Sequence, residues 1–301
     1  MSQVTDPIIL DSTGQDIVTQ LQAIANELNV QLNQVPRPNL LLNPWFTVNQ
    51  RGWASGANVN GSYCVDRWKM DSGGGLGTIA VSSSGITLTP NSAEGAYIDI
   101  QQLFENTSEL IGKTITASIM LSDGTIYSGT GTVPSGGQIT PISEPAFGVN
   151  VSASRFMVYA SNDTALSLRA VKLEIGETST LAYDVAPNYT EELLKCQRYF
   201  VRIKSEAAKF AIATISTWSS SEAVAVMYLP VKMRTLPTLS TAGSFILRIA
   251  GADNNVSTLT LTTSSDNIAN FYITSSGLVA GQSGRLCGNS GTEYIDLSAE
   301  L

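Results

Sequence analysis

The stretch TITASIMLSDG, residues 114–124, carries the pattern that decides the fold. Apolar side chains alternate with small hydroxyl-bearing ones at its start, which is the period of two expected of a half-buried β-strand. Ser122-Asp123-Gly124 then supplies a turn cluster. The same alternation recurs along the chain after residue 38, and Gly-rich clusters such as Ser135-Gly136-Gly137 interrupt it. We therefore expect a mainly β protein of antiparallel strands.

The predicted strands form two groups. The first group comprises residues 79–81, 86–89, 97–100, 114–121, 155–160 and 166–175. The second comprises residues 199–203, 208–215, 223–229, 244–249, 257–262, 270–274 and 293–297. A Ser/Thr-rich boundary at 176–189 and a short amphipathic helix at about 190–196 lie between the groups. We expect two antiparallel β-sandwich or jelly-roll domains, residues 37–176 and 177–301, each long enough to bury its own core.

Residues 1–36 follow a different pattern, that of a short amphipathic helix. Its apolar seam has the alternating steps of four and three that are typical of a coiled coil, at Ile17, Leu21, Ile24 and Leu28. Pro36-Arg37-Pro38 ends the helix and provides a hinge. A helix of this length is marginal alone in water, so the seam needs a cover. That cover is its own domain, sister copies in a trimer, or a larger assembly.

Composition excludes several classes of function. The chain contains no histidine, which removes a Ser-His-Asp triad, a Cys-His pair and the commonest zinc ligand. Its net charge of −8 argues against nucleic acid and against an anionic membrane surface as partners. Ser and Thr together supply 64 residues, so the surface is rich in hydroxyl groups and not in charge. We expect no cofactor and no bound metal.

Three cysteines, Cys64, Cys196 and Cys287, lie far apart without a CxxC motif, and we interpret them as reduced and mostly buried. The start of the chain lacks the basic and apolar regions of a secretory signal. The longest apolar run, residues 223–231, is too short to span a bilayer, so we expect no membrane insertion. These observations favour a protein folded in a cytoplasm without export.

Tryptophans are the candidates for ligand binding. Sugar rings stack on exposed aromatic faces, and Trp45, Trp53 and Trp218 lie among Gly, Asn, Ser and Thr residues that favour exposure. Phe46 and Trp68 are instead expected in the core. Acidic residues are scattered, and nothing in the sequence assigns two of them to a paired-carboxylate site. The sequence thus favours a binding protein over an enzyme.

Several short strings, in order, resemble the sandwich domains of bacteriophage and prophage tail-fibre or appendage proteins. In the first half they are NLLLNP (39–44) with Phe46, NQRG (49–52), YCVDRW (63–68), GKTIT (112–116) and VKLEIG (171–176). In the second half they are CQRYF (196–200), LPVKMR (229–234) and Pro237-Thr238. Phe200 and Lys232 depart from the usual pattern, which has Tyr and Pro there. The resemblance covers about residues 39–238.

The resemblance implies a virion structural protein that assembles as a homotrimer in the host cytoplasm. Residues 1–36 would attach it to other virion structural proteins, and its carbohydrate-binding-module-like β-domains would bind host cell-surface polysaccharide without catalysis. A capsid decoration or head-fibre protein shares every one of these features. A polysaccharide depolymerase that uses two carboxylates is a third alternative.

Overall fold

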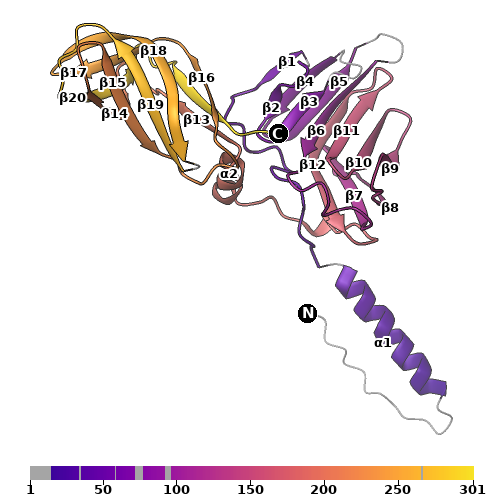
Figure 1. The fold of residues 1–301 in the computed structure, drawn as a ribbon. Helices are drawn as coiled ribbons and strands as arrows, with labels where there is room; N and C mark the ends of the chain where they lie inside the picture. The colour runs from indigo at the N-terminus through magenta and orange to yellow at the C-terminus, as the bar shows by residue number, and fades with distance from the viewer. Residues whose placement is uncertain (1–14, 34, 58, 72–76, 92–95, 266) are drawn as a thin grey trace.

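Antiparallel β-strands make up 49% of the structure, a computed structural model that describes residues 15–33, 35–57, 59–71, 77–91, 96–265 and 267–301. The strands build two units, each with its own hydrophobic core, and a single long helix stands apart from both (Figure 1). The mainly β, antiparallel class expected from the strand pattern is confirmed.

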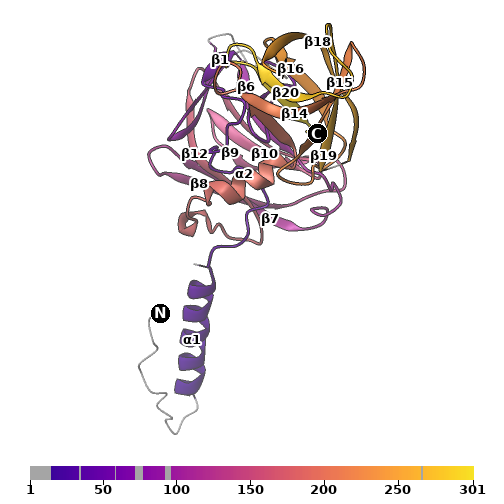
Figure 2. The same ribbon diagram turned by 90° about the vertical axis from the view of Figure 1, so that its left-hand side faces the viewer.

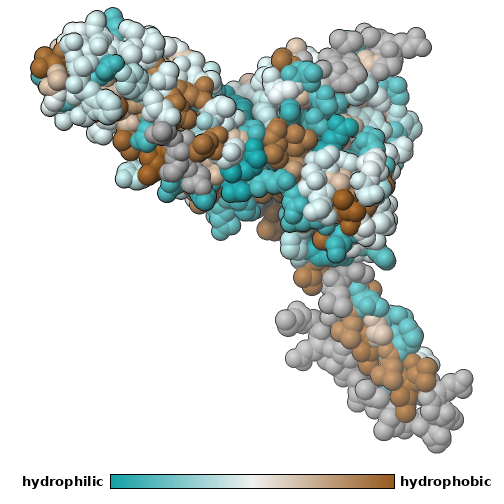
Figure 3. All heavy atoms as spheres, viewed as in Figure 1, coloured by the Kyte–Doolittle hydropathy of each residue, from teal (hydrophilic) through white to brown (hydrophobic). Residues whose placement is uncertain are grey.

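Helix α1 (Gln15–Asn33) projects away from the β-units in two perpendicular views (Figures 1 and 2). Leu21 and Leu28 of the predicted seam are 55% and 52% exposed, while Ile17 and Ile24 are partly exposed. Hydrophobic atoms line the visible side of the helix (Figure 3). The described part of this chain therefore leaves the seam uncovered, which removes docking onto its own domain from the alternatives. The beginning of the predicted anchor, residues 1–14, lies outside the described residues.

The first unit consists of two six-stranded sheets over one core. Its strands are β1 (Ser55–Ala57), β2 (Tyr63–Val65), β3 (Trp68–Asp71), β4 (Gly77–Ser82), β5 (Gly85–Pro90), β6 (Tyr97–Leu103), β7 (Thr114–Leu121), β8 (Ile126–Thr132), β9 (Gln138–Ser143), β10 (Phe147–Ser152), β11 (Arg155–Ser161) and β12 (Leu166–Ile175). One sheet has the order β1-β4-β5-β12-β7-β8, and the other has the order β2-β3-β6-β11-β10-β9.

Aromatic rings fill the space between these two sheets. Trp68 is fully buried, with its ring centroid 5.2 Å from that of Phe46 and 6.1 Å from that of Phe156. Its indole N–H donates to the carbonyl of Asn43 at 2.9 Å, so the ring is buried without an unsatisfied polar atom. The expectation that Phe46 and Trp68 belong to the core is confirmed.

The second unit is not the sandwich that the sequence predicts. Its strands are β13 (Phe200–Lys204), β14 (Ala211–Thr217), β15 (Glu222–Tyr228), β16 (Thr238–Ala242), β17 (Phe245–Ile249), β18 (Ala252–Ser265), β19 (Ile268–Ser275), β20 (Ser283–Gly288) and β21 (Tyr294–Ser298). Six of them close a barrel in the order β14-β15-β19-β18-β17-β20, and β13-β21-β16 form a separate sheet. Closure occurs because β14 pairs with β15 on one side and with β20 on the other. Two register shifts in the long strand β18 bend it, and bending of this kind lets a sheet curl into a barrel.

A linker with a short 3-10 turn, η1 (Leu181–Tyr183), and helix α2 (Tyr189–Gln197) connect the two units. The Asn188 side chain caps α2 by accepting hydrogen bonds from the backbone N–H groups of Thr190 and Glu191. The predicted helix at about 190–196 is therefore confirmed. The chain then returns at its end, because Tyr63 Oη of the first unit donates to the carbonyl of Leu301 at 2.9 Å.

A buried polar cluster fastens this linker to the outer face of β12. Lys172 and Glu174 are both fully buried. Lys172 Nζ donates to Asp184 Oδ1 at 2.6 Å and to Thr180 Oγ1 at 2.8 Å. Glu174 accepts hydrogen bonds from the backbone N–H and the hydroxyl of Thr180, each at 2.7 Å. Each buried charge thus has a partner on the linker or on β12.

Two further expectations are met by the described residues. Cys64, Cys196 and Cys287 are free thiols and all three are buried, as the sequence indicates. Among the helices of the described part of the chain, none has the length and hydropathy needed to cross a membrane.

Candidate functional site

Strand β6 has one apolar face and one polar face. Ile98 and Ile100 are fully buried between the two sheets. Because successive side chains of a strand point to opposite faces, Tyr97, Asp99 and Gln101 lie on the outer face of the sheet. Buried and mostly aliphatic residues thus hold β6 in place while its polar residues face outward.

The register of the neighbouring strands gathers more polar groups beside Asp99. Asp99 is the Cα partner of Asp71 in β3 on one side and of Tyr159 in β11 on the other. Tyr159 is in turn the partner of Gly148 in β10. A Cβ atom at Gly148 would clash with the Tyr159 hydroxyl, so glycine makes room for the phenol ring above β10.

These outward residues line a groove of about 520 Å³ on the sheet. Among its lining side chains are Tyr97, Asp99, Gln138, Asn150, Arg155 and Tyr159. The side-chain carbonyl of Asn150 accepts a hydrogen bond from the Thr140 hydroxyl at 2.8 Å, which fixes that amide. A groove of this size is large enough for a small ligand or for a few units of a polymer.

A hydrogen-bonded network compensates one of the two carboxylates in the groove. Arg155 Nη1 lies 3.5 Å from Asp71 Oδ2 and donates to Gln101 Oε1 at 3.0 Å. Gln101 Nε2 donates to the same Asp71 oxygen at 3.1 Å. The single guanidinium of the groove is therefore engaged by Asp71 and Gln101.

Asp99 lies beside this network with less compensation. Its side chain is 1% exposed, and its Oδ1 atom has no hydrogen-bond partner in the described part of the chain. Burial, reinforced by the negative charge of Asp71, raises the pKa of Asp99 to about 7, and Arg155 offsets only part of this shift. A buried hydrogen-bond acceptor without a donor costs free energy. A ligand that donates a hydrogen bond to Asp99 Oδ1 would recover that cost.

The groove offers the chemistry of saccharide recognition. Tyrosine rings give apolar faces for the C–H groups of a sugar ring, while side-chain amides and a carboxylate bond its hydroxyl groups. The sequence predicts the strand at 97–100, but the residues of its polar face were not among the candidates. The signal was present as Tyr97, Asp99 and Gln101 alternating with two isoleucines.

The tryptophans predicted to bind sugar lie elsewhere. Trp45 is half-buried, with the Arg169 guanidinium 5.4 Å from its ring centroid, and lines three smaller hollows of about 420, 330 and 270 Å³. Trp53 packs against the core and donates its indole N–H to the carbonyl of Ile79 at 3.2 Å. Trp218 is 65% exposed in the turn between β14 and β15. None of the three lines the groove, and their role in sugar binding stays a prediction.

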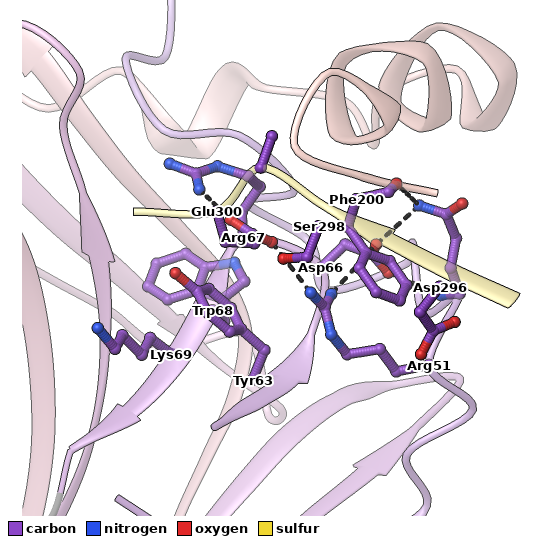
Figure 4. Close-up of polar contacts among 12 residues, drawn as sticks. Arg51, Tyr63, Asp66, Arg67, Trp68, Lys69, Phe200, Asp296, Ser298 and Glu300 are labelled. Atoms are coloured by element: carbon purple, nitrogen blue, oxygen red, sulfur yellow. Dashed lines mark hydrogen bonds and ion pairs between the residues drawn. The ribbon is translucent and has the colours of Figure 1, made fainter. Parts of the chain in front are cut away.

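A second concentration of charge lies at the junction of the two units (Figure 4). Arg51 bridges Asp66 Oδ1 at 3.4 Å and Glu300 Oε1 at 3.2 Å. Arg67 pairs with the other oxygen of Glu300, donates to the carbonyl of Leu103 at 2.8 Å, and stacks on the Tyr199 ring at 3.6 Å. Burial raises the pKa of Asp66 to about 6 against the opposing charge of Arg51. The carboxylates of this cluster have partners within the chain, so it joins the units and offers no ligand site.

No protein-family model matches the chain, and no curated protein matches it in sequence. The described residues contain no group of three or more Cys, Asp or Glu side chains placed to hold a metal ion. The geometry of the groove and the motif resemblance are therefore what indicate a function for this protein.

Proposed function

We propose that the protein is a virion fibre or appendage protein that binds a host-surface glycan, without catalysis, in the groove between β3 and β9. The observation that carries this proposal is Asp99, a buried carboxylate with an unpartnered oxygen, in an open groove that also contains Tyr97 and Tyr159. Such an arrangement lowers the stability of the empty protein, and a ligand that donates to it recovers the loss.

The remaining features fit this function. We propose residues 37–176 as a carbohydrate-binding-module-like sandwich and residues 177–301 as a second, C-terminal fibre domain. Residues 1–36 would attach the protein to other virion proteins and assemble three copies, since the exposed seam of α1 needs a cover. Three weak sites on one particle raise the avidity by orders of magnitude, about 10²–10⁴-fold for linked modules.

Replacing Tyr159 with alanine tests the groove. The change removes one of the aromatic faces of the groove, so the affinity for host polysaccharide should fall by about 10- to 100-fold. Binding to immobilised glycans measures this loss, and each tenfold change in affinity corresponds to about 1.4 kcal/mol. Trp218→Ala is the matched control, because it removes an exposed aromatic ring outside the groove. Loss of binding in the Trp218 variant, with full binding in the Tyr159 variant, would move the site to the barrel.

Replacing Leu21 and Leu28 with glutamine tests the seam. Both leucines are more than half exposed, so the change should leave the β-units folded and lower the solution mass from three copies of the 31.9 kDa chain to one. Ala23→Gln with Val30→Gln is the control, because both residues are exposed on α1 away from the seam. Equal masses for the two double variants, or a monomeric parent protein, would refute the trimer.

One observation favours a second candidate function, cleavage of the glycan. Asp71 and Asp99 are directly opposite each other on neighbouring strands, and burial together with the charge of Asp71 raises the pKa of Asp99 to about 7. Glycosidases use a pair of carboxyl groups in which the one with the raised pKa acts as the general acid. Incubation with host polysaccharide and an assay for new reducing ends decides between the two functions, and release of fragments that Asp99→Asn abolishes would establish the enzyme.

Location on the virion is a separate question from binding. Labelled antibodies against the β-units should decorate the tail of the particle if the protein is a tail fibre. Signal on the head would instead favour the capsid-decoration or head-fibre alternative.

A further inference from the structure

We infer that the groove selects a glycan with a free amino group, whose ammonium ion pairs with Asp99. This inference rests on the proposed glycan binding and adds the chemical class of the sugar. The charged groups that face the groove are Asp71 from β3, Asp99 from β6 and Arg155 from β11, so the site carries one net negative charge when both carboxylates are ionised.

No cation of the described chain supplies the missing partner. Arg155 is engaged by Asp71 and Gln101. Lys69 lies on the neighbouring strand β3, opposite Gln101, but its Nζ is directed to the carbonyl of Leu301 at 3.4 Å. Asp99 therefore lacks a hydrogen-bond donor at Oδ1, and the positive charge of Arg155, which is shared with Asp71, offsets only part of the rise in its pKa.

The classes of sugar differ in what they bring to this carboxylate. A neutral hydroxyl supplies a donor and leaves the charge uncompensated, and an acidic sugar adds repulsion. An ammonium group supplies up to three donors and a positive charge, and charge-assisted hydrogen bonds are about twice as strong as neutral ones. The rings of Tyr97 and Tyr159 also line the groove, and aromatic faces attract cations.

The direct test compares two oligosaccharides that differ only in this group. Fully de-N-acetylated chito-oligosaccharides and their fully N-acetylated counterparts are titrated into the full-length protein by calorimetry at pH 7. We expect the amino form to bind at least about tenfold more tightly, which corresponds to 1.4 kcal/mol. Asp99→Asn, which keeps the shape and removes the charge, should abolish that difference between the two oligosaccharides.

The possible outcomes separate the amino-sugar inference from the proposed glycan binding. Equal or tighter binding of the N-acetylated oligomer refutes the selection of an amino sugar while the glycan-binding groove survives. Binding of neither oligomer, with Tyr159-dependent binding of another polysaccharide, also refutes the amino-sugar inference alone. Absence of Tyr159-dependent binding to any host glycan refutes the proposed function itself.

A measurement without ligand tests the same residue independently. The folded pKa of Asp99 lies above its ordinary value, so the charged form destabilises the protein fully above pH 7 and not at all near pH 4. Asp99→Asn should therefore raise the Tm at pH 8, and the gain should shrink as the pH falls from 7 to 4. The groups that face Asp99 are Asp71 from β3, Tyr97 on β6, and Arg155 and Tyr159 from β11, and burial raises the pKa of Tyr97 above its ordinary value. A lower Tm for the variant at pH 8 would show that the fold itself satisfies Asp99 and would refute the inference.

Discussion

Replacement of Arg67 with alanine is expected to lower the free energy of unfolding by about 3–5 kcal/mol, the usual cost of breaking a buried ion pair from one side. The side chains of Arg67 and Glu300 are 2% and 5% exposed. Without Arg67, Glu300 keeps only the more distant Arg51, and the carbonyl of Leu103 loses its donor. The Tyr199 ring also loses the guanidinium that stacks on it. The two units are therefore expected to unfold more independently in this variant.

Chemical denaturation followed by intrinsic fluorescence measures this loss. Lys113→Ala is the control, since Lys113 is exposed and its removal should change the free energy of unfolding by about 0.5 kcal/mol or less. The double variant Arg67→Met with Glu300→Gln should recover part of the loss, because it leaves no unpaired charge. A change of less than 1 kcal/mol for Arg67→Ala would mean that the junction contributes little to stability, on the scale of an exposed pair.

The second large effect is expected from Lys172→Met in the cluster that fastens the linker. The change keeps the length of the side chain and removes its charge, so Asp184 loses its ion pair and Thr180 loses a donor. Glu174 remains buried with Arg37 Nε at 3.8 Å as its cation. We expect a loss of about 3–5 kcal/mol and release of the linker from β12.

Lys113→Met is the matched control for this variant. Lys113 is exposed, so the same substitution there should change the free energy of unfolding by about 0.5 kcal/mol or less. Hydrogen exchange across residues 177–188 reports the release directly. Unchanged protection of that segment in Lys172→Met, or equal losses in the two variants, would contradict the role given to the cluster.

Local pattern was sufficient to predict α1, α2 and the strands with clean alternation. The strand at 126–132 was missed because its sequence, IYSGTGT, contains two glycines that argue against a strand. Both glycines are required by packing, since a Cβ at Gly129 would clash with the carbonyl of Pro141 and one at Gly131 would crowd Ile139. Tertiary contacts thus override local propensity in this part of the first unit.

Closure of the barrel depends on pairing between distant strands and not on any single strand. The partners of β14 are β15, the next strand, and β20, almost seventy residues further along the chain. Alternation within Ala211–Thr217 is the same whether the strand ends a sandwich or closes a barrel. The predicted second sandwich was wrong for this reason.

The residues of the groove, like the closure of the barrel, could not be predicted from local sequence. Residue type makes Trp45, Trp53 and Trp218 the predicted sugar-binding residues. Asp99 and Tyr159 are common residue types within β-strands, so residue type alone does not single them out. Only the register of β6 against β11, two strands far apart in sequence, places them side by side. The sequence therefore predicts the mainly β class and does not predict where the groove lies, and glycan binding stays a proposal.

The most direct test of the central claim, that the groove holds the glycan, is a crystal structure of the protein with a saccharide that it binds. We expect the sugar on the outer face of β6 and β11, with a donor within hydrogen-bonding distance of Asp99 Oδ1 and a ring against Tyr159. A sugar seated instead on Trp45, Trp53 or Trp218, with Asp99 untouched, would contradict it.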